Sequence, residues 1–223
     1  MSTDLGSETS RPAPSRPYVS ILIIAASCIA FLNSHAVLAG LGIPGTLSST
    51  GIYPWGALYG PWVQKGQWWR ILTMVIEHGG ILHIVLNMSV VYTLGFSLER
   101  NIGHFRFAVI SGVTAMGASG FALLLAFHQL TVGASGMILG WAGAMLCITS
   151  AQGRRGLWVW LAQVALISFL PGVSWQGHLG GFLFGLPCGL ALRQGAGRFQ
   201  VLAPFLIFSA AAFALFAGFH PIR

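Results

Sequence analysis

The chain has 223 residues, of which 55% are hydrophobic and only 7% charged, and its formal net charge is +7. A soluble domain of this size carries about a quarter charged residues, so this chain has too little polar surface to remain a globule in water. The positive charge does not indicate a nucleic-acid partner, because the basic residues are scattered and form no stripe interleaved with aromatic residues. Composition therefore predicts a polytopic, all-α membrane protein whose surroundings are the lipid bilayer.

The N-terminal end has a different composition from the rest. Residues 1–17 are polar and contain Pro, Ser and two arginines, so we expect a disordered tail on the cytoplasmic side. The apolar run that begins at Tyr18 has the composition of a signal peptide or of a first span. No convincing small-residue cleavage site follows it, and the later segments need it for their orientation, so we expect a retained span.

Further apolar runs follow, and each is judged by length, since a helix needs about 20 apolar residues to cross the bilayer core. Seven runs qualify within a few residues: 18–39, 80–98, 105–127, 135–151, 155–171, 178–194 and 199–218. The stretch 41–79 is rich in Gly and Trp and contains three prolines. It is expected to be a long loop with interfacial pieces, because Trp prefers the membrane interface.

The basic residues test this segmentation, because cytoplasmic loops carry an excess of Lys and Arg. If the N-terminus is inside, the cytoplasmic segments hold eight of these residues and the outer segments hold three. The sequence therefore predicts an N-in, C-out topology.

The cysteines predict no cross-link. An odd, widely spaced set forms neither a disulfide framework nor a metal-binding motif. We interpret Cys28, Cys147 and Cys188, which all lie in apolar runs, as small buried hydrophobic residues.

Four polar residues lie at or near the outer ends of predicted spans. They are His83 and Asn87 in the second span, Ser135 in the fourth and His178 in the sixth. Polar groups at membrane depth are costly and mark functional sites by default. Because all three spans begin on the outer side, the four residues are predicted to meet at a similar depth.

Ser135 lies in the segment Gly133-Ala134-Ser135-Gly136, whose small neighbours leave the hydroxyl unshielded. The span that begins here is short, about 22–25 Å long against about 30 Å of hydrocarbon. Its start is therefore expected to lie below the outer surface, at the floor of a water-filled cavity. The alternative is that the segment is only a small-residue packing patch.

His178 begins a span in which glycines recur every four residues, at 177, 181, 185 and 189. Such a ladder allows another helix to pack closely, and the fourth span offers Gly136, Gly140 and Gly143. A serine hydroxyl must come within about 3 Å of its base imidazole, so close approach is a chemical requirement. Ordinary helix packing would explain the ladder alone, but not the histidine at its start.

The positions of the acidic residues limit which classes of protease the chain can belong to. The only aspartate is Asp4, in the tail, so a serine hydrolase here would use a Ser-His dyad without an Asp. An aspartic protease is excluded because it needs two carboxylates within the membrane. No His-Glu-x-x-His motif of a zinc protease occurs.

His83 and Asn87 are four residues apart and share one face of the second span. Both side chains carry donors that could stabilise an oxyanion, as could the backbone N–H of Ser135. The alternative is that His83 and Asn87 satisfy each other between helices.

Taken together, these residues resemble the rhomboid intramembrane proteases over about residues 62–195. The resemblance is carried by Trp69-Arg70, His78, His83, Asn87, Gly133-Ala134-Ser135-Gly136, and His178 with Gly181 and Gly185. It implies Ser135 as the nucleophile, His178 as general base and acid, and His83 and Asn87 lining the oxyanion hole. It implies no metal and no cofactor.

The resemblance also implies an organisation. A six-helix rhomboid core would cover 18–195, and 199–218 would be an additional C-terminal transmembrane helix. Trp69-Arg70 would belong to a structured first loop in the outer leaflet, His78 would lie near the cavity mouth, and Glu99-Arg100 would be structural. Many members carry an aromatic residue four positions after the serine that stacks on the histidine, whereas this chain has Leu139.

The function expected from this resemblance is that of a serine endopeptidase that cleaves single-span transmembrane substrates near the outer membrane face. The alternative is a catalytically silent rhomboid-fold protein that binds membrane helices. A small transporter or channel is disfavoured, because no acidic residue lies well inside a span. The short chain and the absence of a transit peptide favour a bacterial inner membrane. The physiological substrate and the oligomeric state are not legible in the sequence.

Overall fold

The structure is a computed structural model that describes residues 16–34 and 55–222. In these ranges the regular secondary structure is helical, and extended backbone pairs only at an isolated bridge between Leu58 and Thr131. The predicted tail, except for residues 16 and 17, lies outside the described residues, as does the first part of the loop predicted at 41–79.

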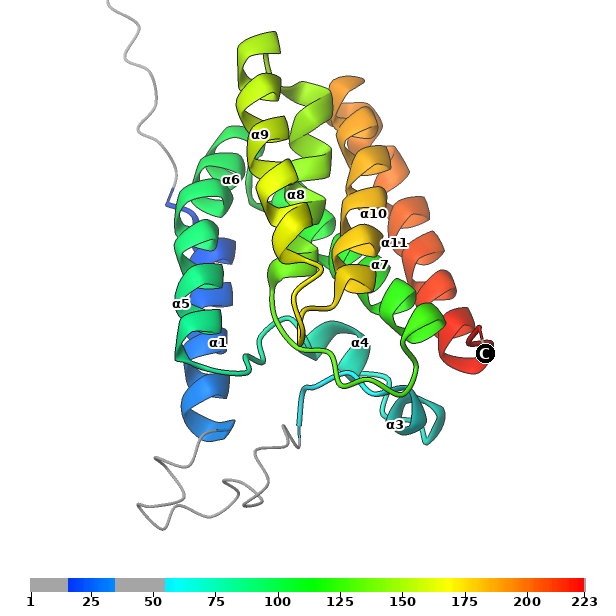
Figure 1. The fold of residues 1–223 in the computed structure, drawn as a ribbon. Coiled ribbons are helices and arrows are strands. Elements are labelled where there is room, and N and C mark those ends of the chain that lie inside the picture. Colours follow the sequence, from blue (N-terminus) through cyan, green and yellow to red (C-terminus); the bar gives the residue numbers. More distant parts are fainter. Residues whose placement is uncertain (1–15, 35–54, 223) are drawn as a thin grey trace, which may run out of the picture.

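A helix lies on each of the seven predicted apolar runs (Figure 1). They are α1 (Tyr18–Ser34), α5 (Ile81–Val90) with its continuation η1 (Val91–Gly95) and α6 (Phe96–Ile102), α7 (His104–Leu125), α8 (Ser135–Ile148), α9 (Ala151–Ile167), α10 (Trp175–Arg193) and α11 (Ala196–Phe219). Among the described residues, three helical stretches are long and apolar enough to cross a membrane: 81–102, 104–125 and 196–219. The count of seven spans and their orientation stay predictions.

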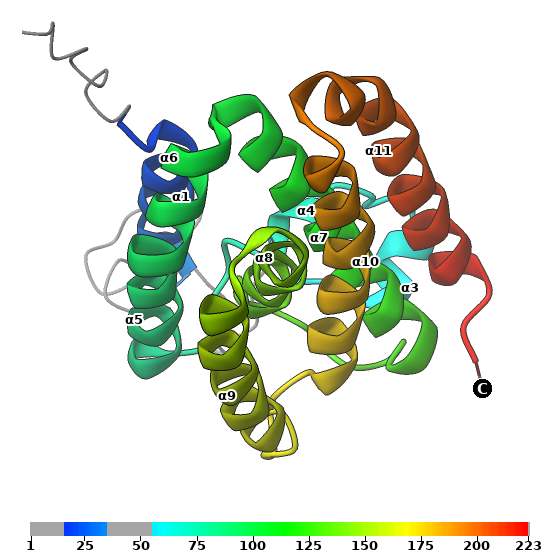
Figure 2. The same ribbon diagram turned by 90° about the horizontal axis from the view of Figure 1, so that it is seen from above.

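Helix α8 occupies the middle of the bundle, with α5, α7, α9 and α10 around it (Figure 2). Its 14 residues give a length of about 21 Å, shorter than the hydrocarbon core of a bilayer. Ten of these 14 residues are buried, including Trp141, whose indole N–H donates to the Ser111 hydroxyl. The sequence of α8 is apolar on every side because the helix is enclosed by other helices.

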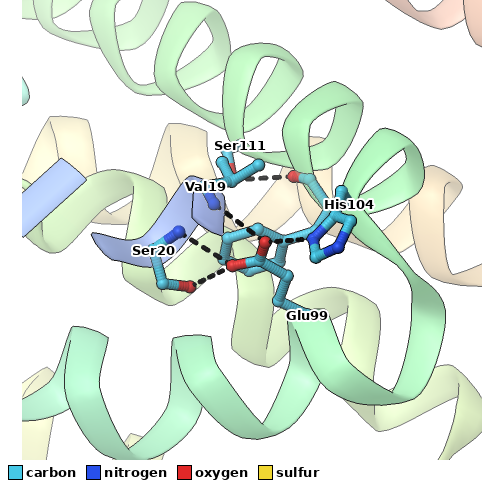
Figure 3. A network of polar contacts seen from close by, with 6 residues as sticks. Val19, Ser20, Glu99, His104 and Ser111 are labelled. Atoms are coloured by element: carbon cyan, nitrogen blue, oxygen red, sulfur yellow. Dashed lines mark hydrogen bonds and ion pairs between the residues drawn. The ribbon is translucent and has the colours of Figure 1, made fainter. Parts of the chain in front are cut away.

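Helix α1 is fastened to α6 by a carboxylate. Glu99 is fully buried and accepts hydrogen bonds from the backbone N–H groups of Val19 and Ser20 and from the Ser20 hydroxyl (Figure 3). Its other partner is His104, 2.6 Å away. The first N–H groups of a helix lack partners within the helix, so Glu99 caps α1 from a neighbouring element. This agrees with a structural role for Glu99.

The loop before α5 contains two short helices, α3 (Gly60–Gln64) and α4 (Arg70–Thr73). Arg70 is buried, donates to Gln67 and to the Ala57 carbonyl, and stacks on the ring of Trp62. Arg70 therefore holds the loop together from inside. Trp69, by contrast, is half-exposed, as an interfacial residue would be.

The burial of the cysteines corrects one expectation. Cys188 is buried and Cys147 is partly buried, but Cys28 is exposed. The prediction was wrong for Cys28 because an apolar residue of a membrane protein can face lipid as well as a neighbouring helix, and composition does not distinguish the two.

Candidate active site

Ser135 is the first residue of α8, and the loop before it is fixed by backbone hydrogen bonds. Thr131 exchanges two such bonds with Leu58, and the N–H of Gly133 donates to the carbonyl of Met74. Gly133 has φ +115°, a backbone conformation that residues other than glycine rarely adopt. The first loop thus sets the position at which the serine enters the bundle.

The glycine ladder of α10 packs directly against α8. A Cβ atom on Gly181 or Gly185 would overlap the carbonyl oxygen of Gly136 or Gly140, respectively. On the other side, a Cβ atom on Gly143 would lie 2.6 Å from the Phe182 carbonyl oxygen. The predicted close approach of these two helices is therefore confirmed.

This packing brings His178 to Ser135. The Nε2 atom of His178 lies 2.7 Å from the Ser135 hydroxyl oxygen, although the residues are 43 positions apart. The imidazole is 8% exposed, so bulk water has little access to the ring. A buried imidazole in hydrogen-bond contact with a serine at a helix N-terminus has the arrangement needed to activate a nucleophile.

The other ring nitrogen of His178 contacts a residue that the sequence analysis missed. Its Nδ1 atom lies 2.6 Å from the hydroxyl of Ser168, which directly follows α9. Ser168 belongs to the predicted run 155–171, and a search of that run for polar residues at its outer end would have found it. Nothing in the sequence, however, indicates that it meets His178.

His83 faces the loop before Ser135. Its Nε2 atom lies 2.6 Å from the position that a Cβ atom on Gly133 would occupy, and its Nδ1 atom is 3.3 Å from the N–H of Gly79. Since that N–H donates to Nδ1, the proton of the neutral ring lies on Nε2, which points toward the Ser135 loop. His83 is thus held as a donor on the nucleophile's side of α5.

Asn87 is buried one helical turn further along α5. Its side-chain amide donates to the backbone carbonyl of His83 at 2.9 Å, so it contacts the backbone of His83 rather than the imidazole. The alternative of a mutual side-chain pair does not match this contact. One amide hydrogen is used within the helix, and an amide nitrogen carries two.

One cavity of about 770 Å³ is lined by all four of the predicted residues, His83, Asn87, Ser135 and His178. The structure therefore brings together the residues that the sequence places on three separate helices. Besides these polar groups the lining is mainly apolar, with contributions from α5 and α9.

Two further residues were expected near the site. His78 is fully buried with its ring edge-on to that of His83, and burial lowers the pKa of His78 to about 4. His78 itself does not line the cavity, but the adjacent Gly79 and His83 do, and its place near the mouth stays a prediction. Leu139 is buried on α8, and within the described residues none of the contacts between aromatic rings involves His178.

Metal ligands do not gather at the site. Within the described ranges, no three His, Cys, Asp or Glu side chains come together in a way that could hold a metal ion.

Comparison with known proteins gives relatives of one kind. The chain is 33% identical over 156 residues to RHOMBOID-like protein 6, mitochondrial, of Arabidopsis thaliana, which covers 66% of this chain and 50% of the relative. It is 27% identical over 188 residues to rhomboid protease GluP of Bacillus subtilis (strain 168), a match that covers 79% of this chain and 37% of the relative. It is 31% identical over 142 residues to rhomboid-like protease 3 of Toxoplasma gondii, a match that covers 59% of this chain and 54% of the relative.

The chain thus spans about half the length, or less, of these curated relatives. A family profile described as a Rhomboid domain matches residues 65–195, which is more than half of the chain and contains all four candidate residues. This chain is a membrane protein that belongs to the rhomboid family.

Proposed function

We propose that this protein is an intramembrane serine endopeptidase that cleaves transmembrane-helix substrates near the outer membrane face. The observation that carries the proposal is the 2.7 Å contact between the Ser135 hydroxyl and His178 Nε2 in a largely apolar cavity. The family membership and the relatives named as proteases support it. A protein that only binds helices has no need of an aligned nucleophile and base.

The reaction begins with attack of the Ser135 oxygen on the scissile carbonyl carbon. His178 accepts the hydroxyl proton on Nε2 and then donates it to the leaving amine, which yields an acyl-enzyme. Water attacks the ester in the second half, with His178 again taking the proton, and the free carboxylate product leaves. No metal and no cofactor enters these steps.

The tetrahedral intermediate carries a negative oxygen that needs donors. The Nε2–H of His83 supplies one, and the backbone N–H of Ser135 supplies another, because the first N–H groups of a helix have no intrahelical partner. The positive end of the α8 dipole acts in the same direction. Asn87 adds its second amide hydrogen.

The substrate enters laterally between α5 and α9. Both helices line the cavity, with Leu86 and Val90 on one and Trp160 and Val164 on the other. No residue of α9 is buried, and its packing is mainly against α8, so little holds it toward α5. A single-span substrate helix that unwinds at its top then presents its scissile bond to Ser135.

The membrane arrangement proposed with this function has six core spans over 18–195, a seventh over 199–218, and an N-in, C-out orientation. This orientation puts the starts of α5, α8 and α10 on the outer side, and these starts lie at one end of the bundle (Figure 1). A bacterial inner membrane is proposed as the location. The relatives include both a bacterial and a plant mitochondrial protein, so the family alone does not select it.

The test is cleavage of a generic single-span substrate by detergent-solubilised protein. Wild type is expected to cleave, whereas Ser135→Ala and His178→Ala are expected to lose at least about 10³-fold in rate. Ser89→Ala is the matched control, since its hydroxyl bonds only to the Leu86 carbonyl of its own helix. If wild type neither cleaves nor reacts with a fluorophosphonate probe at Ser135, the alternative of a silent helix-binding protein replaces this proposal.

A further inference from the structure

Ser168 closes a chain of hydrogen bonds that starts at the nucleophile. The Ser135 hydroxyl lies 2.7 Å from His178 Nε2, and His178 Nδ1 lies 2.6 Å from the Ser168 hydroxyl. The Ser168 hydroxyl in turn lies 2.7 Å from the backbone carbonyl of Val164. Ser168 is 5% exposed, so water does not readily replace any of these partners.

The direction of this chain follows from the carbonyl at its end. The Val164 oxygen can only accept, and two oxygens at 2.7 Å repel each other unless a proton lies between them. The single proton of the Ser168 hydroxyl therefore points to Val164. Its oxygen must then accept from His178, so Nδ1 carries a proton.

This direction selects the tautomer of the neutral imidazole. A ring with its proton on Nδ1 has its lone pair on Nε2, and that lone pair faces the Ser135 hydroxyl. The opposite tautomer would point an N–H at Ser135 and could not take its proton. We infer that Ser168 is a positioning residue that holds His178 in the tautomer and orientation in which it acts as a base.

The surroundings of His178 leave this task to Ser168. Within the described part of the chain, no aspartate or glutamate lines the cavity, and none of the contacts between aromatic rings involves the His178 imidazole. The group that contacts His178 Nδ1, on the side of the ring away from Ser135, is therefore a neutral hydroxyl rather than a carboxylate. It orients the ring but does not neutralise the charge that the ring gains during the reaction.

The inference rests on the proposed function for its kinetic part, but the tautomer can be measured without turnover. The experiment uses the full chain in detergent with ¹⁵N-labelled histidine, and His178→Ala identifies the two ring signals. Wild type is expected to show a protonated Nδ1 and an unprotonated Nε2. Ser168→Ala is expected to shift the population toward the opposite tautomer, and Ser168→Thr, which keeps the hydroxyl, is expected to restore it.

The second readout is the rate of fluorophosphonate labelling at Ser135, together with kcat and KM for a model substrate. Ser168→Ala is expected to lower the labelling rate and kcat about tenfold, the scale of one neutral hydrogen bond, with KM unchanged. Ser168→Thr should recover most of this loss. Ser89→Ala, which removes a similar hydroxyl-to-carbonyl bond that involves no imidazole, should change neither value.

These measurements distinguish failure of the role inferred for Ser168 from failure of the proposed protease activity. Wild type with its proton on Nε2, or Ser168→Ala with the tautomer and labelling rate of wild type, would overturn the role of Ser168 while leaving the protease proposal in place. Absence of both cleavage and labelling in wild type would overturn the protease proposal, and with it the role of Ser168 in that reaction.

Discussion

The backbones of Gly136 and Gly181 lie so close together that a Cβ atom on Gly181 would overlap the Gly136 carbonyl oxygen. Gly136 directly follows Ser135, and Gly181 lies about one turn after His178, so the spacing of α8 and α10 fixes the distance between nucleophile and base. A change in this contact should affect stability and activity together.

Gly181→Ala tests this coupling. The new methyl group must push the helices apart, and overpacking of this kind costs about 1–3 kcal/mol. We expect a lower unfolding temperature in detergent and a loss of Ser135 labelling. Gly112→Ala is the control, because Gly112 lies within α7 and a Cβ atom there meets nothing within 4 Å. Equal behaviour of the two variants would contradict the proposed importance of the α8–α10 contact.

Gly133→Ala tests the loop before the nucleophile. It combines an unfavourable φ of +115° with a methyl group 2.6 Å from His83 Nε2. We expect kcat to fall at least about tenfold, because the new methyl group must displace either the His83 imidazole or the loop before Ser135. Gly66→Ala carries the φ penalty alone, since φ is +89° and nothing lies within 4 Å. If Gly66→Ala lowers kcat as much, backbone strain rather than the contact with His83 is responsible.

His83→Ala tests the proposed oxyanion donor. Removing one such donor lowers kcat by about 10²–10³-fold in a serine protease, and a similar loss is expected here with little change in KM. Asn87→Ala is expected to cost less, about tenfold, because part of its amide is already bonded to the His83 carbonyl. Steady-state cleavage of a model substrate measures both. A larger loss of kcat for Asn87→Ala than for His83→Ala would make Asn87 the main oxyanion donor and His83 the minor one.

Glu99→Ala tests the attachment of α1. The substitution removes the acceptor of the part-buried Val19 N–H and of the buried Ser20 N–H, which should lower the free energy of unfolding by about 3 kcal/mol. Thermal unfolding in detergent, followed by circular dichroism, measures the change. Arg100→Ala is the comparison, because Arg100 stacks on Phe96 and its loss should cost at most about 1 kcal/mol. If Arg100→Ala lowers stability as much as Glu99→Ala does, the capping of α1 by Glu99 alone does not explain the effect.

The sequence determined where the long apolar helices lie and which polar residues are candidates for the site. Apolar runs of sufficient length must form helices in a bilayer, because each helix satisfies its own backbone groups. His83, Asn87, Ser135 and His178 stand out for the same reason, since polar side chains are expensive at membrane depth. The glycine spacing in 177–189, together with the small residues of the fourth span, also indicated close packing of these two helices.

The tertiary structure decided which atoms meet. Composition could not tell that Cys28 faces outward while Cys188 is enclosed, since lipid and protein interiors are equally apolar. It could not tell that Glu99 accepts from α1 and contacts His104, or that Ser168 reaches His178. These contacts join residues distant along the chain or on different helices, and a hydrogen bond depends on distances of tenths of an ångström that only the packing of the helices sets.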